Sequence, residues 1–163
     1  MKIPSIKQIK DRRNEGFTLV EILVVIGVIA VLLAVALIAI NPNQHFIDSR
    51  NAQRQNNVTA IMDAIYAYQA ANEGSLPEAL QGEIETPTII GDDDTEGEID
   101  LCSALVPAYI ADLPGDPESG ETQGDTCADG DYSTGYTILK SESNRFTIAA
   151  PDAEGDATIS ITR

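Results

Sequence analysis

The sequence contains one carboxyl group in a setting where carboxyl groups are rare. Glu21 is the only ionisable residue in an apolar run that extends from Phe17 to Ile40. The run has 24 residues, and an α-helix of that length rises about 36 Å, enough to cross a hydrocarbon core of roughly 30 Å. A charged side chain within such a span is costly and marks a functional site by default. The simplest alternative is that Glu21, one turn into the run, reaches back to the lipid headgroups.

The charges on the two sides of this apolar run have opposite signs. Residues 1–16 contain five cations and two acids, a net charge of +3, whereas residues 17–163 contain five cations and 24 acids, a net charge of −19. Because positive charge stays on the cytoplasmic side, we expect a single-pass topology with the N-terminus inside and the C-terminus outside. A secretory signal cleaved after Ala34-Val35-Ala36 is the alternative, but its apolar region should span only about 7–15 residues.

Residues 16–21 read Gly-Phe-Thr-Leu-Val-Glu and stand between the basic segment and the long apolar run. This pattern resembles the N-terminal signal of type IV pilins and of the pseudopilins of type II secretion, over about residues 10–72. In that family a prepilin peptidase cleaves after the glycine and methylates the new terminal amine. The resemblance therefore implies a cytoplasmic leader, residues 1–16, that is cleaved after Gly16. It also implies an N-methylated Phe17 as the first residue of the mature chain.

The resemblance gives Glu21, the fifth residue of such a mature chain, a role in assembly. A free terminal amine is mostly cationic at neutral pH, so the carboxylate of one helix can compensate the amine of a neighbour when helices stack. Thr18 is expected to help by hydrogen bonding near the terminus. The implied partners are identical or homologous pilin subunits in a helical homo-oligomer, the prepilin peptidase and an inner-membrane assembly platform. The precursor would lie in the cytoplasmic membrane, and the mature chain in an extracellular or periplasmic filament.

The remaining sequence predicts an α+β fold in which a long helix packs against a small antiparallel sheet, as in pilins. Proline at Asn41-Pro42 ends or kinks the transmembrane helix expected over residues 17–40. Apolar residues at helical spacing then predict an amphipathic spine helix over residues 41–73. The expected apolar face is Val58, Ile61, Met62, Ile65 and Tyr68 or Gln69. The side chains expected to face water are Asp48, Arg50, Arg54 and Asn57.

Residues 74–163 are expected to form a loop region and then the sheet. Residues 74–100 contain glycines, prolines and an acidic run, which predicts a loop. A short helical turn is expected over residues 99–106. Three runs that alternate with period two predict a three-stranded antiparallel sheet; they are residues 136–139, 145–149 and 157–161. The buried face of that sheet is expected to consist of Tyr136, Ile138, Phe146, Ile148, Ile159 and Ile161.

The two cysteines of the chain, Cys102 and Cys127, are both placed outside the cytoplasm by the expected topology. Disulfides persist in that environment, so we expect the two residues to be joined. Closing a loop of about 25 residues stabilises a fold by roughly 3.5 kcal/mol in the chain-entropy model. Two free thiols, or a metal pair without histidine, are the alternatives.

The loop between the short helical turn and the sheet is the candidate metal site. Its oxygen-bearing side chains are Asp116, Ser119, Asp125, Asp129 and Asp131. Hard oxygen donors on a loop are the ligands that Ca²⁺ takes, and the major pseudopilins that this chain resembles carry calcium beside the sheet. Residues 105–117 resemble the stretch before that site. The spacing is not that of an EF-hand, and a solvated acidic loop is the alternative, so no cofactor is required and calcium is the one candidate.

Several function classes find no support in the sequence. It has no Gly-rich phosphate loop and no G-x-S-x-G motif, and His45 is its one histidine, so we do not expect an enzyme. Phosphate backbones are bound through Lys and Arg, of which residues 17–163 hold five, so direct nucleic-acid binding is disfavoured. The expected function is a structural subunit of a type IV pilus or pilus-like filament. The alternatives are a calcium-stabilised major pseudopilin and, from another class, a membrane-anchored extracytoplasmic binding or enzymatic domain.

Overall fold

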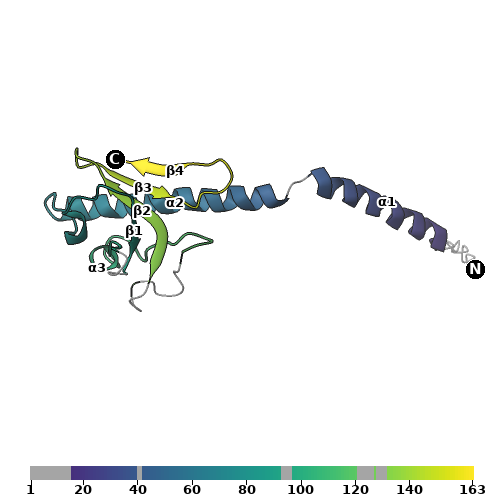
Figure 1. The fold of residues 1–163 in the computed structure, drawn as a ribbon. Helices are drawn as coiled ribbons and strands as arrows, with labels where there is room; N and C mark the ends of the chain where they lie inside the picture. Colours follow the sequence, from purple (N-terminus) through teal and green to yellow (C-terminus); the bar gives the residue numbers. More distant parts are fainter. Residues whose placement is uncertain (1–15, 40–41, 93–96, 121–126, 128–131) are drawn as a thin grey trace, which may run out of the picture. The chain divides into compact units, whose positions relative to one another are not determined.

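A computed structural model describes the protein over residues 16–39, 42–92, 97–120, 127 and 132–163 (Figure 1). The chain forms two compact units, Met1–Pro42 and Asn43–Arg163. The first unit contains helix α1 (Leu19–Ala39). The second, called the head below, is built on helix α2 (Pro42–Ala71) and a four-stranded sheet.

Helix α1 is apolar on all sides, with Glu21 as its one acidic residue. From Leu19 to Leu37, the exposed fractions of its large apolar side chains range from 48% at Ile29 to 79% at Leu19. By length and composition, Leu19–Leu37 could cross a membrane. A helix that is apolar all round needs lipid or other apolar helices around it, because water is a poor solvent for every face.

Helix α2 begins at a proline and ends at a left-handed turn. Proline suits the first helical position, where its missing N–H has no helical partner to lose. Glu73 and Gly74 have φ values of +57° and +87°, and the Gly74 N–H donates to the Gln69 carbonyl over 2.8 Å. This bond satisfies a carbonyl at the helix end. The structure thus ends the helix at Ala71, just before the stop predicted at Glu73-Gly74.

The head has the α+β fold predicted from the sequence. Its strands are β1 (Thr88–Gly91), β2 (Ser133–Lys140), β3 (Phe146–Ala150) and β4 (Ile159–Thr162), paired antiparallel in the order β1-β2-β3-β4. The register aligns Ile138 with Ile148 and Ile148 with Ile161. These apolar side chains therefore lie on one face of the sheet, which covers one side of α2 (Figure 1).

The prediction of three strands is wrong, because the sheet has a fourth strand within the segment expected to be a loop. Strand β1 pairs Ile89 with Thr137 of β2, and Ile90 is fully buried. A parallel bridge from Ile90 to Ile99 covers the other edge of β1. Three β-branched residues between a proline and a glycine are too few for a period-two signal, so β1 depends on pairing with the open edge of β2. The remaining elements are the short helices η1 (Glu78–Leu80) and α3 (Cys102–Leu105).

One hydrophobic core joins α2 to the sheet. The helix contributes the predicted face at Val58, Ile61, Met62 and Ile65, all with no exposed surface. The sheet contributes the predicted residues Tyr136, Ile138, Phe146, Ile148 and Ile159, whereas Ile161 is only partly buried. Residues from β1, the two short helices and the segments next to them, outside the predicted faces of α2 and the sheet, complete the core; they are Leu80, Ile90, Leu101, Leu105 and Leu113.

The predicted water-facing side of α2 is wrong at Arg54. Its side chain has no exposed surface, and three carboxylates from other parts of the head form ion pairs with it. Arg50 and Asn57 are also partly buried, and only Asp48 is exposed as expected. Asn57 donates to the Gly115 carbonyl over 3.0 Å and to the Tyr136 hydroxyl over 2.9 Å. This side of α2 is therefore a contact surface within the head.

Candidate functional site

The peptide bond between Gly16 and Phe17 is open to solvent in the first unit. Phe17 is 82% exposed, and a Cβ placed on Gly16 would meet no other atom within 4 Å. The packing of the described chain therefore does not require a glycine at this position. If glycine is required here, the requirement comes from another molecule that recognises this peptide bond.

Thr18 and Glu21 form a capping box at the first turn of α1. The Thr18 N–H and hydroxyl donate to Glu21 Oε2 over 2.9 and 2.8 Å, and the Glu21 N–H donates to Thr18 Oγ1 over 3.2 Å. Such a box satisfies N–H groups that have no partner within the helix. A carboxylate in the first turn also suits the positive end of the helix dipole. The two residues singled out for assembly are thus in direct contact, as their spacing of three allows.

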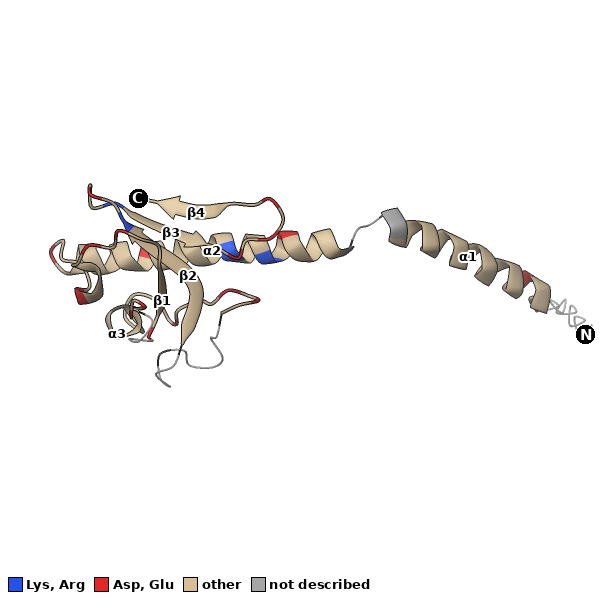
Figure 2. Cartoon of the chain, in the orientation of Figure 1, with Lys and Arg blue, Asp and Glu red and all other residues tan. Residues whose placement is uncertain are grey.

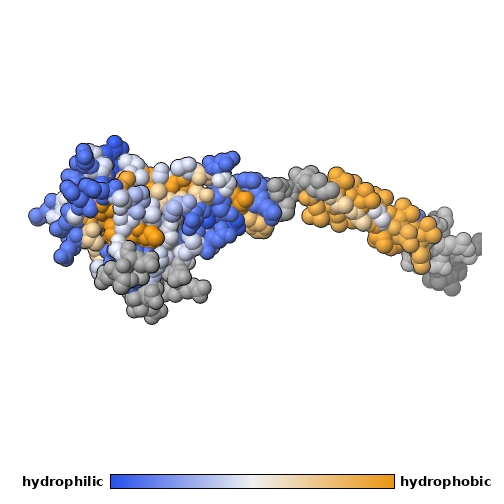
Figure 3. Space-filling model, viewed as in Figure 1, coloured by the Kyte–Doolittle hydropathy of each residue, from blue (hydrophilic) through white to orange (hydrophobic). Residues whose placement is uncertain are grey.

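Beyond this turn, α1 offers no further polar group that could bind a partner by charge. Figure 3 shows the apolar side chains that cover the visible face of the helix. Large apolar side chains lie on its other faces too, and from Leu19 to Leu37 each of them is at least 48% exposed. Gly27 has open space where a Cβ would lie. The chemistry available to α1 is therefore burial of apolar surface, with one carboxylate at its first turn.

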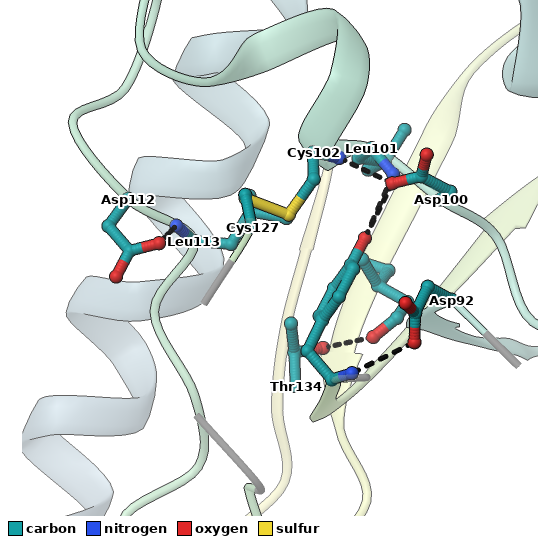
Figure 4. Close-up of a disulfide and its surroundings, with 10 residues drawn as sticks. Asp92, Asp100, Leu101, Cys102, Asp112, Leu113, Cys127 and Thr134 are labelled. Atoms are coloured by element: carbon teal, nitrogen blue, oxygen red, sulfur yellow. Dashed lines mark hydrogen bonds between the residues drawn. A yellow bond between two sulfur atoms is a disulfide. The ribbon is translucent and has the colours of Figure 1, made fainter. Parts of the chain in front are cut away.

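In the head, Cys102 and Cys127 are joined by a disulfide, as the sequence predicts, with a Cα–Cα distance of 5.4 Å (Figure 4). The bond connects the first residue of α3 to a residue 25 positions later. Cys102 also donates its N–H to Asp100 Oδ1 over 2.7 Å. The disulfide therefore fixes Cys127 next to the start of α3.

A buried tyrosine beside this disulfide ties the start of β2 to α3. The Tyr132 hydroxyl donates to Asp100 Oδ1 over 2.9 Å and accepts the Leu101 N–H over 3.2 Å, while the Tyr132 N–H donates to Asp92 Oδ1 over 2.8 Å. Burial, helped by the nearby Asp100 carboxylate, raises the pKa of Tyr132 above its ordinary value. The hydroxyl therefore stays protonated at neutral pH. No pattern in the sequence marks Tyr132 or Asp100 as part of a site.

The largest set of charged groups in the described part of the head surrounds Arg54 of α2. Arg54 Nε and Nη2 donate to Asp116 Oδ2 and Oδ1 over 2.6 and 3.0 Å, and Nη1 donates to Glu154 Oε2 over 2.8 Å. The side chains of Arg54 and Asp116 have no exposed surface. Arg50, one turn earlier on α2, forms a second ion pair with both carboxylate oxygens of Glu154. Figure 2 shows these two arginines as the blue positions on α2.

Asn51 completes this arginine cluster, defined here as Arg50, Asn51, Arg54, Asp116 and Glu154. Its amide donates to the Glu154 carbonyl over 2.9 Å, and its oxygen accepts the Glu154 N–H over 3.1 Å. The same oxygen accepts from Arg54 Nη1 over 3.0 Å. The cluster therefore connects α2 to the loop before β2 and to the connection between β3 and β4. Each buried side-chain polar atom among the described residues has a hydrogen-bond partner.

The charges of the cluster shift the pKa values of its carboxyl groups. Hydrogen bonds from Arg50 and then Arg54 lower the pKa of Glu154 to about 2. Burial alone would raise the pKa of Asp116, but hydrogen bonds from Arg54 and from the backbone of Glu118 and Ser119 outweigh it and lower that pKa. Both carboxyl groups are therefore ionised at neutral pH and hold the arginines in place.

Two of the five residues in the candidate calcium set lie among the described residues, and both are bound within the protein. Asp116 accepts two bonds from Arg54 and the N–H groups of Glu118 and Ser119. The Ser119 hydroxyl donates to Asp152 Oδ2 over 2.6 Å. Asp116 and Ser119 therefore do not fit a calcium site, because a metal ion would have to displace these partners. The other members of the set, Asp125, Asp129 and Asp131, lie outside the described residues.

The predicted site residues thus form separate groups. Gly16, Phe17, Thr18 and Glu21 are brought together at the start of α1, and the two cysteines are brought together in the head. The arginine cluster is not predicted from the sequence, because its arginines are expected there to face water. A signal is present, since Arg54 lies four residues before Val58 and so continues the apolar stripe of α2.

The comparisons with known proteins concern the first of these groups. Residues 11–37 match the family model described as the prokaryotic N-terminal methylation motif. This motif is the prepilin-type signal of type IV pilins and pseudopilins, so the resemblance seen in the sequence is confirmed over that segment. It implies processing by a prepilin peptidase and assembly with other pilin subunits, and with α1 it fits a membrane-anchored precursor. No curated protein and no solved structure matches the chain.

Proposed function

We propose that this protein is a structural subunit of a type IV pilus or a pilus-like filament. In this proposal the precursor is held in the cytoplasmic membrane by α1, with its leader in the cytoplasm and its head outside. Cleavage after Gly16 and methylation of Phe17 produce the mature subunit. The apolar helices of neighbouring subunits then cover one another in the filament, and the heads form its surface. The role is structural, not catalytic.

The observation that carries the proposal is the combination of an exposed apolar helix with one carboxylate at its first turn. Apolar surface this extensive is covered by lipid in a precursor and by neighbouring helices in a filament. In both settings an ionised Glu21 needs a partner of opposite charge, since an unpaired charge in apolar surroundings is costly. Cleavage after Gly16 would create a cationic amine on Phe17, next to the first residue of the capping box. The amine of an adjacent subunit can then pair with Glu21 when the helices stack with an axial step.

A second candidate function is that of a major pseudopilin in a type II secretion pseudopilus. It is favoured by the loop sequence of residues 113–117, Leu-Pro-Gly-Asp-Pro, which resembles the stretch before the calcium site of those proteins. A calcium-stabilised head is part of that candidate. The contacts of Asp116 with Arg54 weigh against it, because they occupy a carboxylate of the candidate calcium set. A membrane-anchored binding or enzymatic domain is the candidate from a different class.

The proposal can be tested by mass spectrometry of N-terminal peptides from two cell fractions, membranes and filaments sheared from the surface. A chain that begins with mono-methylated Phe17 in the sheared fraction is the expected result for a surface pilus. The same terminus confined to membranes would indicate the pseudopilus. A chain that begins at Met1 in both fractions, or one that begins at Leu37, would overturn both filament functions and favour an anchored or secreted domain.

A matched variant separates processing from folding. Gly16→Val should leave the described structure unchanged, because nothing lies within 4 Å of the position of its Cβ. We expect this variant to accumulate in membranes with its leader attached. Normal processing of Gly16→Val would show that the peptidase does not read this position, and would contradict the assigned cleavage site.

A further inference from the structure

We propose that Arg54 is the cation that holds the loops of the head to α2. The acidic loop sequence suggests a calcium ion for this structural role, and Arg54 takes its place. The proposal goes beyond filament assembly, since it concerns how the head itself is held together. It has two parts. The head folds independently of divalent cations, and the cage around Arg54 is shaped for a planar guanidinium and not for a metal ion.

The geometry around Arg54 supports the first part. Its guanidinium makes four hydrogen bonds, two to Asp116, one to Glu154 and one to Asn51, at distances of 2.6 to 3.0 Å. Through these bonds one cation joins α2 to two segments that lie 62 and 100 residues further along the chain. Joining distant loops through carboxylate oxygens is what a structural calcium ion does. Here a side chain that cannot dissociate does the same.

The arrangement of the oxygens supports the second part. Asp116 receives two parallel bonds from Nε and Nη2, whereas Glu154 and Asn51 receive bonds from Nη1 at another edge of the guanidinium. Paired bonds of this kind match the planar fork of arginine. Among the described residues, no three acidic, histidine or cysteine side chains are grouped closely enough to hold one metal ion. The acceptor oxygens therefore lie around the edges of the planar guanidinium, and they do not converge on a single point as the ligands of a metal ion do.

The experiment uses the full chain in detergent and follows the head by near-ultraviolet circular dichroism. All five tyrosines lie between Tyr66 and Tyr136 and so report on the head alone. We expect the melting temperature of the wild-type head to be the same in calcium chloride and in EDTA. Arg54→Ala should melt roughly 10–25 °C lower, because it leaves the buried Asp116 carboxylate without its cation.

The decisive measurement is chemical rescue of Arg54→Ala. Millimolar methylguanidinium should raise its melting temperature with the logarithm of concentration, as expected for a ligand that binds only the folded state. Calcium should not raise this melting temperature, and neither should millimolar urea, which is planar but neutral. Arg54→Met is the matched control, because its side chain fills the space that the added cation would occupy. Rescue should also be lost when Asp116→Asn is combined with Arg54→Ala.

Three results would overturn the proposal. They are a wild-type head that melts several degrees higher in calcium than in EDTA, an Arg54→Ala head that calcium restores as well as methylguanidinium does, and an Arg54→Ala head that melts like the wild type. If Arg54→Ala does not fold, Arg54→Lys replaces it in the experiment; it keeps the charge without the fork and should melt below the wild type, with or without calcium. The calcium titration of the wild type needs no variant. None of these measurements depends on filament formation, so they fail or succeed separately from the proposed function.

Discussion

Thr18 and Glu21 hold each other through three hydrogen bonds of 2.8 to 3.2 Å at the first turn of α1. The Glu21 carboxylate therefore has a local partner before any other subunit is present. Capping its own helix and the proposed compensation of a neighbouring amine use the same carboxylate. The capping contact and the charge can be separated by substitution, because glutamine accepts the same bonds without a charge.

The first prediction concerns the charge of Glu21. Glu21→Gln keeps the capping box, and Glu21→Ala removes both the box and the charge. If compensation of a neighbouring amine drives assembly, both variants should be processed after Gly16 but should yield few sheared filaments. The measurement is the amount of the protein in sheared and membrane fractions by immunoblot. A normal filament yield from Glu21→Gln would contradict the pairing and leave capping as the role of this residue.

The second prediction concerns the cap alone. Thr18→Ala removes the hydroxyl that accepts the Glu21 N–H, whereas Thr18→Ser retains a hydroxyl in the same place. We expect filament yield to fall less in Thr18→Ala than in Glu21→Gln, because the carboxylate charge is still present. Thr18→Ser should resemble the wild type. If Thr18→Ala abolished filaments as completely as Glu21→Gln, the position of the carboxylate would matter as much as its charge.

The sequence is sufficient to predict the parts of the fold that have a repeating pattern. The apolar stripe of α2 and the alternating runs of β2, β3 and β4 each satisfy a period, and the structure buries most of their predicted faces. Strand β1 is not predicted, because its three β-branched residues are too few to show the period-two alternation of a strand. Its position depends on pairing with β2, a strand far along the chain, and such pairing leaves no local signal.

The position of Arg54 on the apolar stripe indicates burial, but the partners that complete the arginine cluster cannot be predicted, for a related reason. A charged residue on an apolar stripe is buried only if opposite charges reach it. For Arg54 those charges are on Asp116 and Glu154, in loops whose course is set by the packing of the whole head. The Thr18–Glu21 contact, in contrast, lies within one helical turn, and its sequence spacing is enough to indicate it.

The third prediction is a loss of head stability in acid. A carboxyl group whose pKa is lowered by folding stabilises the folded state above its unfolded pKa, and this contribution is lost as the pH falls toward the folded pKa. The pKa of Glu154 falls to about 2, and that of an unfolded glutamate is about 4.3. The melting temperature should therefore be steady near neutral pH and should fall between about pH 4 and pH 2.

Substitution of Glu154 tests which group causes this loss. Glu154→Gln should lower the melting temperature at neutral pH and make its decline in acid shallower, because the titrating group is gone. Glu85→Gln, at an exposed position outside the cluster, is the matched control and should decline like the wild type. A decline of equal steepness in Glu154→Gln and the wild type would assign the acid sensitivity to other carboxyl groups.

The fourth prediction concerns the disulfide between Cys102 and Cys127. The bond closes a loop with a sequence separation of 25, and loss of such a cross-link typically costs about 2–4 kcal/mol. The double variant Cys102→Ala and Cys127→Ala should therefore unfold at a lower urea concentration than the oxidised wild type. Reduced and alkylated wild type is expected to lose stability in the same direction. Because Cys102 and the buried Tyr132 both donate to Asp100 Oδ1, near-ultraviolet circular dichroism should report the change. Equal urea midpoints for the oxidised wild type and the double variant would show that Asp100 and Tyr132 hold this part of the head without the disulfide.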